Sequence, residues 1–363
     1  MNIGIPKERR NFEYRVGLSP NFVKMLTQEG HTCYVEHEAG LGTSYSDLEY
    51  EQAGARIVYS PREVFGRADL LLKVARPTDE ELEWFRPGTA LAGLLHLGSA
   101  RHDKIEKLLE NEITAIAYEQ IVLQDGTWPV RKPLSLIGGI LAAQIGARLL
   151  QNNAGGKGIL IGGMPGVPPA EVVIIGAGIA GTGAARAFLG MGAHVTVMDT
   201  SMNALQVIYD NLPGIATAMS NPVSIAHACT FADVLVGAIL VPGEQPPKVV
   251  TRDMVRTMKP RSVLMDISID EGGCFETSRP TTHEKSTFVE EGVIHYCVPN
   301  MPSLVARTAT HAFLNAAFPY IRDLAYKGID NAIAESTALQ HGVATYQGEI
   351  RNISSLSPLA EVE

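Results

Sequence analysis

The sequence predicts an α/β protein made of two Rossmann-like domains with parallel sheets, a cleft between them, and long buried helices as links. Apolar runs of strand length alternate with helix-like segments along most of the chain, a pattern typical of parallel strands joined by crossover helices. The 363 residues are too many for one small core and about right for two domains. A glycine-rich loop at residues 176–181, set between an apolar run and an Ala-rich helix, is typical of dinucleotide-binding domains.

The composition is that of an ordinary globular protein and excludes several classes of partner. Hydrophobic residues make up 45% and charged residues 19%, and the net charge is −9 with a pI of about 5.6. A nucleic-acid binder would need a basic face, and a membrane span would need an apolar run of about 18 residues, which the sequence lacks. The N-terminus, MNIGIPKERR, does not have the layout of a signal peptide. We therefore expect a cytoplasmic protein that binds small molecules, with no nucleic-acid or membrane partner.

The cysteines and histidines indicate a reducing compartment and no metal site. Cys33, Cys229, Cys274 and Cys297 lie far apart and none forms a CxxC pair, so we expect free and mostly buried thiols. The ten histidines include no HxH or HxxxH pair, which argues against a zinc site.

The first part of the chain contains strand-like runs separated by helical patterns. Ser19-Pro20 predicts the start of the first helix, because serine caps a helix and proline favours its first position, and Gly30 predicts the end. The predicted strands are Asn2–Ile5, Thr32–Glu36, Asp69–Val74, Ala90–Leu95 and Thr114–Ala117.

A long apolar helix and a Gly/Pro-rich segment mark the passage to the second domain. Leu134–Leu150 is apolar on nearly every helical face, which predicts a connecting helix that is buried on all sides. The segment NNAGGKGILIGGMPGVPP that comes next predicts the start of the second domain. The predicted strands of that domain are Glu171–Ile175, His194–Val197, Val234–Ala238, Ser262–Ile267 and Val293–Val298.

After about residue 305 the pattern becomes helical, and we expect this part to return to the first domain because the second sheet is already complete. The predicted boundaries are 1–130 plus 305–363 for a discontinuous substrate-binding and catalytic domain, and 131–304 for a Rossmann domain. The final segment, GEIRNISSLSPLAEVE, is polar and weakly patterned, so we expect it to be partly disordered.

The glycine loop has the context that a dinucleotide site requires. Gly176 permits a tight turn after the strand, Gly178 lets the backbone approach a pyrophosphate, and Gly181 lets the helix pack closely on the strand. The helix N-terminus then carries partial positive charge toward the phosphates. Asp199 ends the next strand, where a carboxylate accepts hydrogen bonds from ribose hydroxyls and repels a 2′-phosphate, so NAD is favoured over NADP. A glycine-rich turn without a ligand is the alternative.

Polar residues come after the predicted strands, at the sheet edge where ligands bind in open parallel sheets. Lys73 and His96 occupy such positions in the first domain, and Asp270 and Asn300 occupy them in the second. Structural roles remain open for three of them: an edge lysine for Lys73, a packed histidine for His96 and an aspartate that caps a turn for Asp270. Arg15 lies among other charges, so a surface role remains open for it as well. A cation inside LLLKVARP needs a partner, which makes Lys73 the most unusual of these groups.

Taken together, these residues resemble the NAD-dependent alanine dehydrogenases, in the wider group that includes the nucleotide-binding subunit of proton-translocating transhydrogenase. The resemblance extends to about residue 345 and is carried by GIPKERRNFEYRVGLSP, LLKV, LLHL, TAIAYE, GGMPGVPPAEVVIIGAGIAGTGAA, GAILVPG, DISIDEGGCFETSRPTTH and HYCVPNMPSLVARTAT. It implies two Rossmann-like domains, NAD as cofactor and a homohexamer.

The resemblance also implies roles for individual residues. Arg15 and Lys73 match cations that hold the substrate carboxylate and keto oxygen, with Asn300 also near the substrate, while His96 matches the catalytic acid/base and Asp270 the catalytic aspartate. Positions that match contacts to NAD are Ser135, Gly176, Gly178, Ile179, Gly181, Asp199, Ser220, Leu240, Ile267, Asp270, Val298, Asn300 and Met301.

The sequence departs from the family pattern beside these positions. The connecting helix usually reads MSE-x-AGR, whereas here Leu136 and Ile140 replace the Glu and the Arg. KVKEP is KVARP, which places Arg76 where an acid is usual, and HLAA is HLGS. NMPGAVPRT is NMPSLVART, so Ser303 and Leu304 replace smaller residues. These changes leave the exact amino-acid substrate open.

The reaction that the resemblance implies is reversible NAD-dependent oxidation of L-alanine to pyruvate and ammonium, with its cellular direction left open. Histidine suits the proton transfer, because the amine must be neutral before hydride leaves Cα. A related enzyme that acts on another amino or imino acid is one alternative. A non-catalytic NAD-binding module of a larger complex is another, which the presence of Arg15, Lys73 and His96 disfavours.

Overall fold

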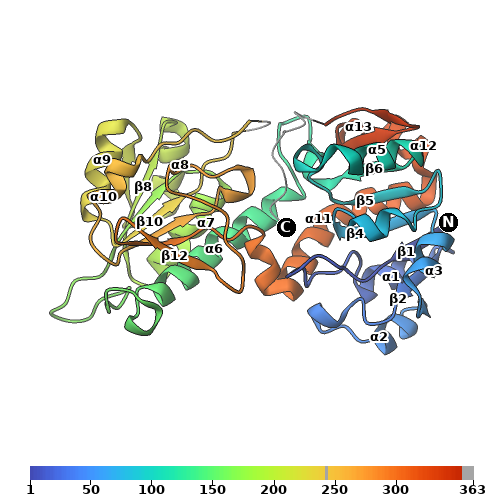
Figure 1. Ribbon diagram of the computed structural model, residues 1–363, viewed down its shortest axis with the longest axis horizontal. Coiled ribbons are helices and arrows are strands. Elements are labelled where there is room, and N and C mark those ends of the chain that lie inside the picture. The colour runs from blue at the N-terminus through green and yellow to red at the C-terminus, as the bar shows by residue number, and fades with distance from the viewer. Residues whose placement is uncertain (242–243, 354–363) are drawn as a thin grey trace. The chain divides into compact units, whose positions relative to one another are not determined.

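The computed structural model describes residues 1–241 and 244–353 (Figure 1). The chain divides into two compact units. Unit 1 comprises residues 1–134 and 303–363, and unit 2 comprises residues 135–302. Each unit is built around one mostly parallel sheet covered by helices, which confirms the predicted α/β class.

The sheet of unit 1 contains eight strands in the order β15-β14-β6-β5-β4-β1-β2-β3. The six strands from β6 to β3 are parallel, whereas β14 pairs antiparallel with β6 and β15 antiparallel with β14. The elements of unit 1 are β1 (Asn2–Ile5), α1 (Pro20–Gln28), β2 (Thr32–Glu36), η1 (Leu41–Thr43), α2 (Asp47–Gln52), β3 (Arg56–Val58), α3 (Pro61–Arg67), β4 (Leu70–Ala75), α4 (Asp79–Leu82), β5 (Ala90–Leu94), η2 (Leu97–Ser99), α5 (His102–Glu110), β6 (Thr114–Ala117), η3 (Tyr118–Gln120), α11 (Ala306–Lys327), α12 (Ile329–Glu335), α13 (Thr337–Gly342), β14 (Val343–Tyr346) and β15 (Glu349–Ile350).

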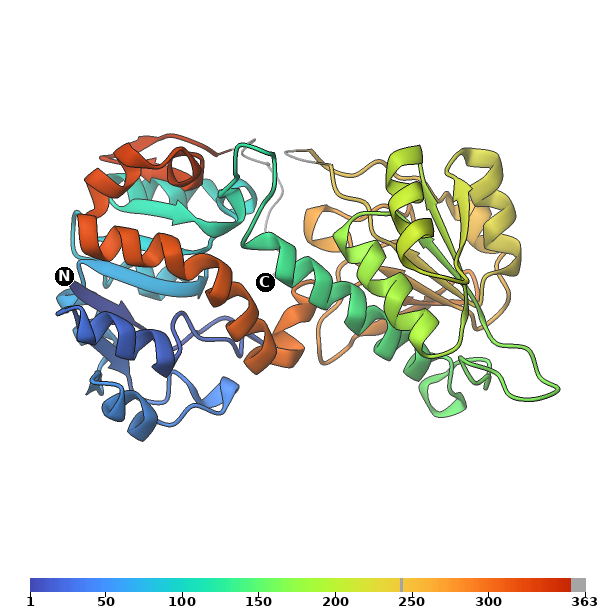
Figure 2. The same ribbon diagram turned by 180° about the vertical axis from the view of Figure 1, so that it is seen from behind.

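Two cores cover the two faces of this sheet, and β4 shows how its residues alternate between them. Leu70, Leu72 and Val74 pack in the core formed with α1 and α11, whereas Leu71 packs in the core formed with α3 and α5. Helix α11 runs along the first face (Figure 2). Because side chains alternate along a strand, Lys73 shares the face of Leu71, on which α4 also lies.

The sheet of unit 2 contains seven strands in the order β12-β13-β11-β10-β7-β8-β9, and only the edge strand β12 runs antiparallel among these described strands. Helices α9 and α10 pack on one face of the sheet, and α6 packs with α7 on the other. The elements are α6 (Arg131–Leu149), η4 (Asn152–Ala154), β7 (Glu171–Ile175), α7 (Ile179–Gly190), β8 (His194–Asp199), α8 (Met202–Asn211), β9 (Ala216–Met219), α9 (Pro222–Phe231), β10 (Val234–Gly237), α10 (Arg252–Arg256), β11 (Val263–Asp266), η5 (Ile269–Glu271), β12 (Thr287–Glu290), β13 (Val293–Tyr296) and η6 (Met301–Val305).

Several details differ from the sequence-based prediction. Helix α6 is not buried on every side: Gly139 and Gly146 pack against α7, but Leu136 and Ile140 each expose 39% of their surface. Ser19 stands at the N-cap of α1 without a side-chain capping bond. The final segment, expected to be partly disordered, begins with the short strand β15, and its residues 354–363 lie outside the described part of the chain.

The four cysteines are buried and free, as predicted. Burial raises the pKa of Cys33 to about 12 and that of Cys229 to about 11, so both thiols stay protonated near neutral pH.

Candidate active site

In unit 1, the predicted site residues lie at the ends of adjacent parallel strands of one sheet. The loop after β1 carries Glu8, Glu13 and Arg15, β4 carries Lys73, and His96 comes after β5. Strands β1, β4 and β5 are consecutive neighbours in the sheet and run parallel, so the groups at their carboxyl ends gather at one sheet edge. The structure therefore brings Arg15, Lys73 and His96 to the same edge.

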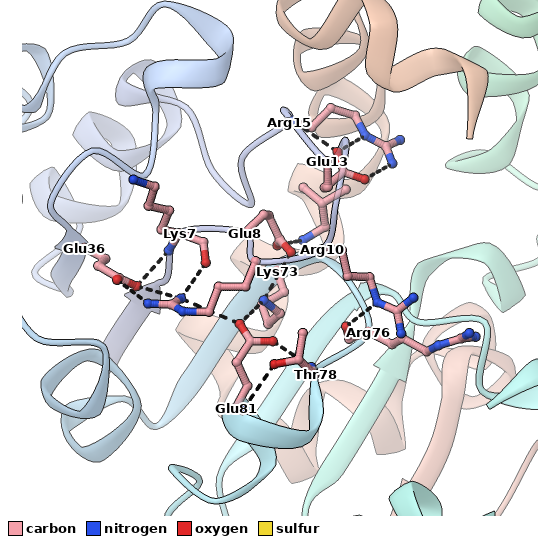
Figure 3. Close-up of polar contacts among 12 residues, drawn as sticks. Lys7, Glu8, Arg10, Glu13, Arg15, Glu36, Lys73, Arg76, Thr78 and Glu81 are labelled. Atoms are coloured by element: carbon pink, nitrogen blue, oxygen red, sulfur yellow. Dashed lines mark hydrogen bonds and ion pairs between the residues drawn. The ribbon is translucent and has the colours of Figure 1, made fainter. Parts of the chain in front are cut away.

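Lys73 is fully buried and held by two carboxylates (Figure 3). Its ammonium lies 2.7 Å from Glu81 Oε1 and 3.1 Å from Glu8 Oε2. The other oxygen of Glu8 accepts the backbone N–H of Val74 at 2.6 Å, and Glu81 also accepts the N–H of Thr78 in the capping box of α4. Lys73 is thus an internal ion-pair lysine, and the edge-lysine alternative is wrong.

These charges shift one another's proton affinities. Burial alone would lower the pKa of Lys73, but the attraction of Glu8 and Glu81 outweighs it and the pKa is raised, so the ammonium stays charged. Burial raises the pKa of Glu8 by more than Lys73 lowers it, and the charge of Glu81 adds to the rise. One cation facing two carboxylates explains why one of the acids is pushed toward its neutral form.

Arg15 is also buried and paired. Its Nε and Nη2 donate to the two carboxylate oxygens of Glu13 at 2.7 and 2.6 Å, a bidentate arrangement that fixes the guanidinium plane (Figure 3). Arg15 is 5% exposed, so the surface-charge alternative is wrong. The hydroxyl of Ser303 accepts the N–H of Tyr14 at 3.1 Å and donates to the carbonyl of Phe12, which ties the turn that carries Arg15 to the segment before α11.

His96 lies directly after β5 with an exposed side chain. Its backbone adopts a left-handed conformation, with φ of 43° and ψ of 46°. The buried carboxylate of Glu119, which comes after the neighbouring strand β6, accepts the N–H groups of Leu95 and His96. The main chain at His96 is thus held in place while its imidazole faces outward.

In unit 2, the glycine loop between β7 and α7 has the geometry of a phosphate-binding turn. Gly176 has φ of +112°, and a Cβ there would lie 2.3 Å from the carbonyl oxygen of Ala238. A Cβ on Gly181 would lie 1.8 Å from the carbonyl oxygen of Gly176, so this glycine permits the close packing of helix on loop. Gly178 stands at the N-cap of α7 and a Cβ there meets nothing within 4 Å, which leaves space over the helix N-terminus.

Asp199 ends β8 beside this loop. Its Oδ2 accepts the N–H of Ala177 at 2.6 Å and its Oδ1 accepts the N–H of Ser201 at 2.7 Å. The carboxylate is therefore fixed against the glycine turn, with lone pairs left on both oxygens.

Asp270 and Asn300 are brought together, although they come after different strands. Asp270 lies in η5 after β11, and its Oδ1 accepts the N–H of Asn300 at 3.0 Å. Asn300 comes after β13 and has a left-handed φ of 54°. The buried carboxylate of Asp266 accepts the N–H of Ser268 and Cys274 and the hydroxyl of Ser278, which organises the loop that carries Asp270.

The remaining predicted cofactor positions lie mostly along the same edge of the sheet of unit 2. Ser220 comes after β9 and its N–H donates to the carbonyl of Asp199. Residues that begin elements or come after strands at this edge are Ile179 of α7, Leu240 after β10, Ile267 after β11, Val298 after β13 and Met301 of η6. Ser135 differs, because it lies on α6 one turn before Gly139, which packs against Ala180 at the start of α7.

Sequence reasoning missed the carboxylates that hold these groups. Four carboxylates bind predicted site residues or their main chain: those of Glu8, Glu13, Glu81 and Glu119. A signal existed for part of this set, since a lysine within an apolar strand requires an anionic partner. Which carboxylate serves as that anionic partner depends on how distant segments of the chain pack together.

Neither membrane-spanning helices nor metal-binding groups of side chains occur among the described residues. Within residues 1–241 and 244–353, no helix has both the length and the apolar character needed to cross a membrane. The same residues contain no group of three or more His, Cys, Asp or Glu side chains arranged to hold a metal ion.

Comparison with known proteins identifies the family. The family models described as "Alanine dehydrogenase/PNT, N-terminal domain" and "Alanine dehydrogenase/PNT, C-terminal domain" match residues 4–137 and 142–353. The alanine dehydrogenase of Staphylococcus saprophyticus is 46% identical over 355 residues, which cover 97% of this chain and 95% of that protein.

Solved structures agree with this result. One L-alanine dehydrogenase superposes with a TM-score of 0.93 at 40% identity and covers 96% of both chains. The transhydrogenase from Sinorhizobium meliloti superposes with a TM-score of 0.84 at 24% identity, covering 96% of this chain and 100% of that one, and shows the shared fold alone. The chain therefore belongs to the alanine dehydrogenase/PNT family.

Proposed function

We propose that this chain is an NAD-dependent alanine dehydrogenase, an oxidoreductase that catalyses the reversible oxidative deamination of L-alanine to pyruvate and ammonium. The observation that carries the proposal is the nearly full-length likeness to proteins named alanine dehydrogenase, at 46% and 45% identity for those of Staphylococcus saprophyticus and Mycolicibacterium smegmatis. The arrangement of charged groups in unit 1 and of the glycine loop in unit 2 supports it.

In this proposal, residues 131–304 bind NAD and residues 1–130 with 305–363 bind the amino acid. The open space over Gly178 at the N-cap of α7 fits a pyrophosphate, and the fixed carboxylate of Asp199 fits a ribose diol. The further contacts proposed for the cofactor come from Ser135, Gly176, Ile179, Gly181, Ser220, Leu240, Ile267, Asp270, Val298, Asn300 and Met301. NAD, when bound, supplies the acceptor for the hydride that leaves Cα of the amino acid.

Arg15 and Lys73 are proposed to bind the substrate carboxylate and, in the reverse direction, the keto oxygen. Both cations are already paired with internal carboxylates, so the substrate has to share them with Glu13, Glu8 and Glu81. Internal pairing holds each cation in one place before the substrate arrives, which lowers the cost of orienting the substrate.

His96 is proposed to take a proton from the substrate ammonium, because only the neutral amine can lose hydride from Cα without building up excess positive charge. Its exposed imidazole suits exchange of that proton with solvent. Asp270 is proposed to stabilise the cationic imine and to orient the water that attacks it, with Asn300 held beside it. The attack gives a carbinolamine, from which loss of ammonia yields pyruvate.

Two further properties are proposed, the assembly of the chain and its location in the cell. The homohexamer that the resemblance implies is testable by sedimentation velocity, where a single species of about six chain masses is expected. Cytoplasmic location is proposed from the sequence pattern.

A different amino or imino acid as substrate is the alternative that Ser303 and Leu304 raised. Ser303 is buried and its hydroxyl is engaged by Phe12 and Tyr14, which argues against a direct role in reading the substrate side chain. The test is to follow NADH formation by absorbance with a panel of common L-amino acids, using NAD or NADP. The highest kcat/KM is expected for L-alanine with NAD, and a tenfold or greater preference for another amino acid would overturn the proposal.

A further inference from the structure

The main chain at His96 is held in a conformation that few non-glycine residues adopt. Its φ of 43° and ψ of 46° lie in the left-handed region, where the Cβ approaches the following carbonyl oxygen. Such a conformation persists only where the surroundings hold it. The hydrogen bonds to the N–H and to the carbonyl oxygen of His96 therefore determine the orientation of its imidazole.

The N–H side of this turn is held by Glu119. Its carboxylate accepts the N–H of Leu95 at 3.0 Å and that of His96 at 2.6 Å. Glu119 is buried and comes after β6, the strand next to β5, so this anchor belongs to the core of unit 1.

The carbonyl side is held by Arg76 and Ser99. The carbonyl oxygen of His96 accepts from Arg76 Nη1 at 3.0 Å, from Ser99 Oγ at 3.0 Å and from the N–H of Ser99 at 3.1 Å. The same Nη1 lies 2.9 Å from Ser99 Oγ.

The donors and acceptors of this group are consistent with one assignment. One N–H of Arg76 Nη1 donates to the His96 carbonyl and the other donates to Ser99 Oγ, while the Ser99 hydroxyl proton goes to the His96 carbonyl. The three residues thus form a closed ring of hydrogen bonds, which we call the His96 brace.

Arg76 itself is anchored. Its carbonyl oxygen accepts from Arg10 Nε at 3.1 Å, and the next residue is Pro77, which restricts the backbone (Figure 3). Arg76 and Ser99 both stand where the sequence departs from the family pattern, in KVARP and HLGS. The two residues contact each other and the same carbonyl oxygen.

We propose that Arg76 and Ser99 are positioning residues for His96, and that together they fix the carbonyl side of its peptide so that the imidazole is held in one orientation. This inference rests on the proposed function, because it takes His96 as the proton-transferring group. Arg76 and Ser99 act through His96 and do not touch the substrate.

The test is a double-mutant cycle with Arg76→Met, Ser99→Ala and both together. The kcat for L-alanine oxidation at saturating NAD is expected to fall about 10-fold in Arg76→Met and in the double variant, since misplacement of a catalytic group lowers the rate by such factors. Ser99→Ala is expected to lower it less. Because both residues act on one carbonyl, the two effects do not multiply.

Two readouts separate positioning from a general structural role. The KM for L-alanine is expected to change less than about twofold, and the kinetic isotope effect with C2-deuterated L-alanine is expected to increase as the chemical steps become limiting. Arg76→Lys, which keeps a cationic donor, should recover part of the lost kcat. Arg86→Met is the matched control: Arg86 donates to the carbonyl of Ala68, just before β4, at the opposite end of that strand. It should leave kcat unchanged.

Three results would overturn the brace: an unchanged kcat in Arg76→Met, a raised KM with an unchanged kcat, or effects that multiply in the double variant. If Arg76→Met does not fold, Ser99→Ala alone decides, since an unchanged kcat there contradicts the proposal. If the unaltered protein fails to oxidise L-alanine, the proposed function fails and a crystal structure of the double variant still tests the brace. The His96 backbone should then leave the left-handed region, and an unchanged φ would contradict the inference.

Discussion

The two units offer polar groups at the same kind of place, the carboxyl ends of parallel strands, but they hold these groups by different means. Unit 1 holds its two cations by buried ion pairs, Lys73 with Glu8 and Glu81 and Arg15 with Glu13, and only His96 through its main chain. Unit 2 uses main-chain geometry, in which glycines make the turn and carboxylates such as Asp199 accept backbone N–H groups.

This difference has an energetic consequence. A buried cation with its carboxylates contributes to binding only while all members remain, because removing one leaves uncompensated charge in the interior. A glycine turn contains no charge that needs a partner. It loses its function only where a new side chain occupies the space that the glycine leaves open. Substitutions in each unit test this contrast, from the largest expected effect to the smallest.

Replacing Lys73 should affect both stability and activity. Lys73→Met removes the cation that Glu8 and Glu81 share and leaves only Arg9, whose Nη1 lies 3.8 Å from Glu81, so the free energy of unfolding should fall by about 3–5 kcal/mol and L-alanine oxidation should be lost. Urea unfolding measures the first effect. Lys107→Met, which removes the exposed Lys107–Glu83 pair, is the control and should leave the unfolding midpoint unchanged. Equal midpoints for the two variants would contradict the buried-pair account.

Replacing His96 should affect the chemistry and leave stability and cofactor binding intact. The imidazole is exposed and unit 2 carries the glycine loop, so His96→Ala should lower kcat by about 10²–10⁴-fold with unchanged NAD affinity. Steady-state kinetics and calorimetric titration with NAD measure the two quantities. Asp270→Asn should also lower kcat, whereas Glu271→Gln, its neighbour in η5, should not. Full activity in His96→Ala would refute the assigned proton transfer.

Alanine substitutions at two glycines of the same loop should have different effects, one on NAD binding and the other on stability. Gly178→Ala places a methyl in open space over the N-terminus of α7, so the KM for NAD should rise about tenfold with little change in stability. Gly181→Ala forces a contact with the carbonyl of Gly176, so the free energy of unfolding should fall by about 1–3 kcal/mol. Thermal unfolding and NAD kinetics on both variants measure the contrast. The reverse pattern would show that the loop has been misread.

Removing the Ser303 hydroxyl should loosen the turn that carries Arg15. Ser303→Ala loses the bonds to Tyr14 and Phe12, and a lost hydrogen bond of about 1 kcal/mol corresponds to a rise of about fivefold in the KM for L-alanine. The kcat should change less than the KM. A fall in kcat at constant KM would place Ser303 in the chemical step instead.

Two buried carboxyl groups, Glu8 and Asp233, should affect the pH dependence of stability in opposite directions. Burial raises the pKa of Glu8, so the folded state holds this proton more tightly than the unfolded state does. The contribution of Glu8 to the free energy of unfolding should therefore be lost as the pH rises above 4.5. Burial alone would raise the pKa of Asp233, but the hydrogen bonds from Lys157 and Lys259 hold that pKa below its ordinary value. The contribution of Asp233 to the free energy of unfolding should therefore be lost as the pH falls below 3.8.

Glu8→Gln should therefore flatten the pH dependence of the unfolding free energy above 4.5, and Asp233→Asn should flatten it at the acidic end. Urea unfolding at a series of pH values measures both. Identical pH profiles for the two variants would contradict these signs.

The sequence predicted the strand ends well because each depends on a local pattern. The first, second and sixth strands of unit 1 have the predicted bounds. His96 and Asp270 were predictable as polar residues just beyond the end of an apolar run. The glycine loop was predictable for the same reason, since its spacing is a local feature of the chain.

Contacts between distant segments were not predictable from such patterns. Strand β14 comes directly after helix α13 and pairs with β6, more than 200 residues earlier, so its place in the sheet depends on the fold and it was not predicted. The role of Glu81 was hidden, because its spacing from Thr78 matches a helix-capping signature and its bond to Lys73 depends on the fold. The left-handed backbone of His96 and its brace likewise depend on three separate strand ends.

The most direct test of the central claim, that this chain transfers hydride from an amino-acid Cα to NAD, is to supply C2-deuterated L-alanine and locate the deuterium. Proton NMR and mass spectrometry of the reduced cofactor should show deuterium at C4 of the nicotinamide together with formation of pyruvate. Reduced cofactor without deuterium, or no reduction at all with L-alanine, would contradict the account.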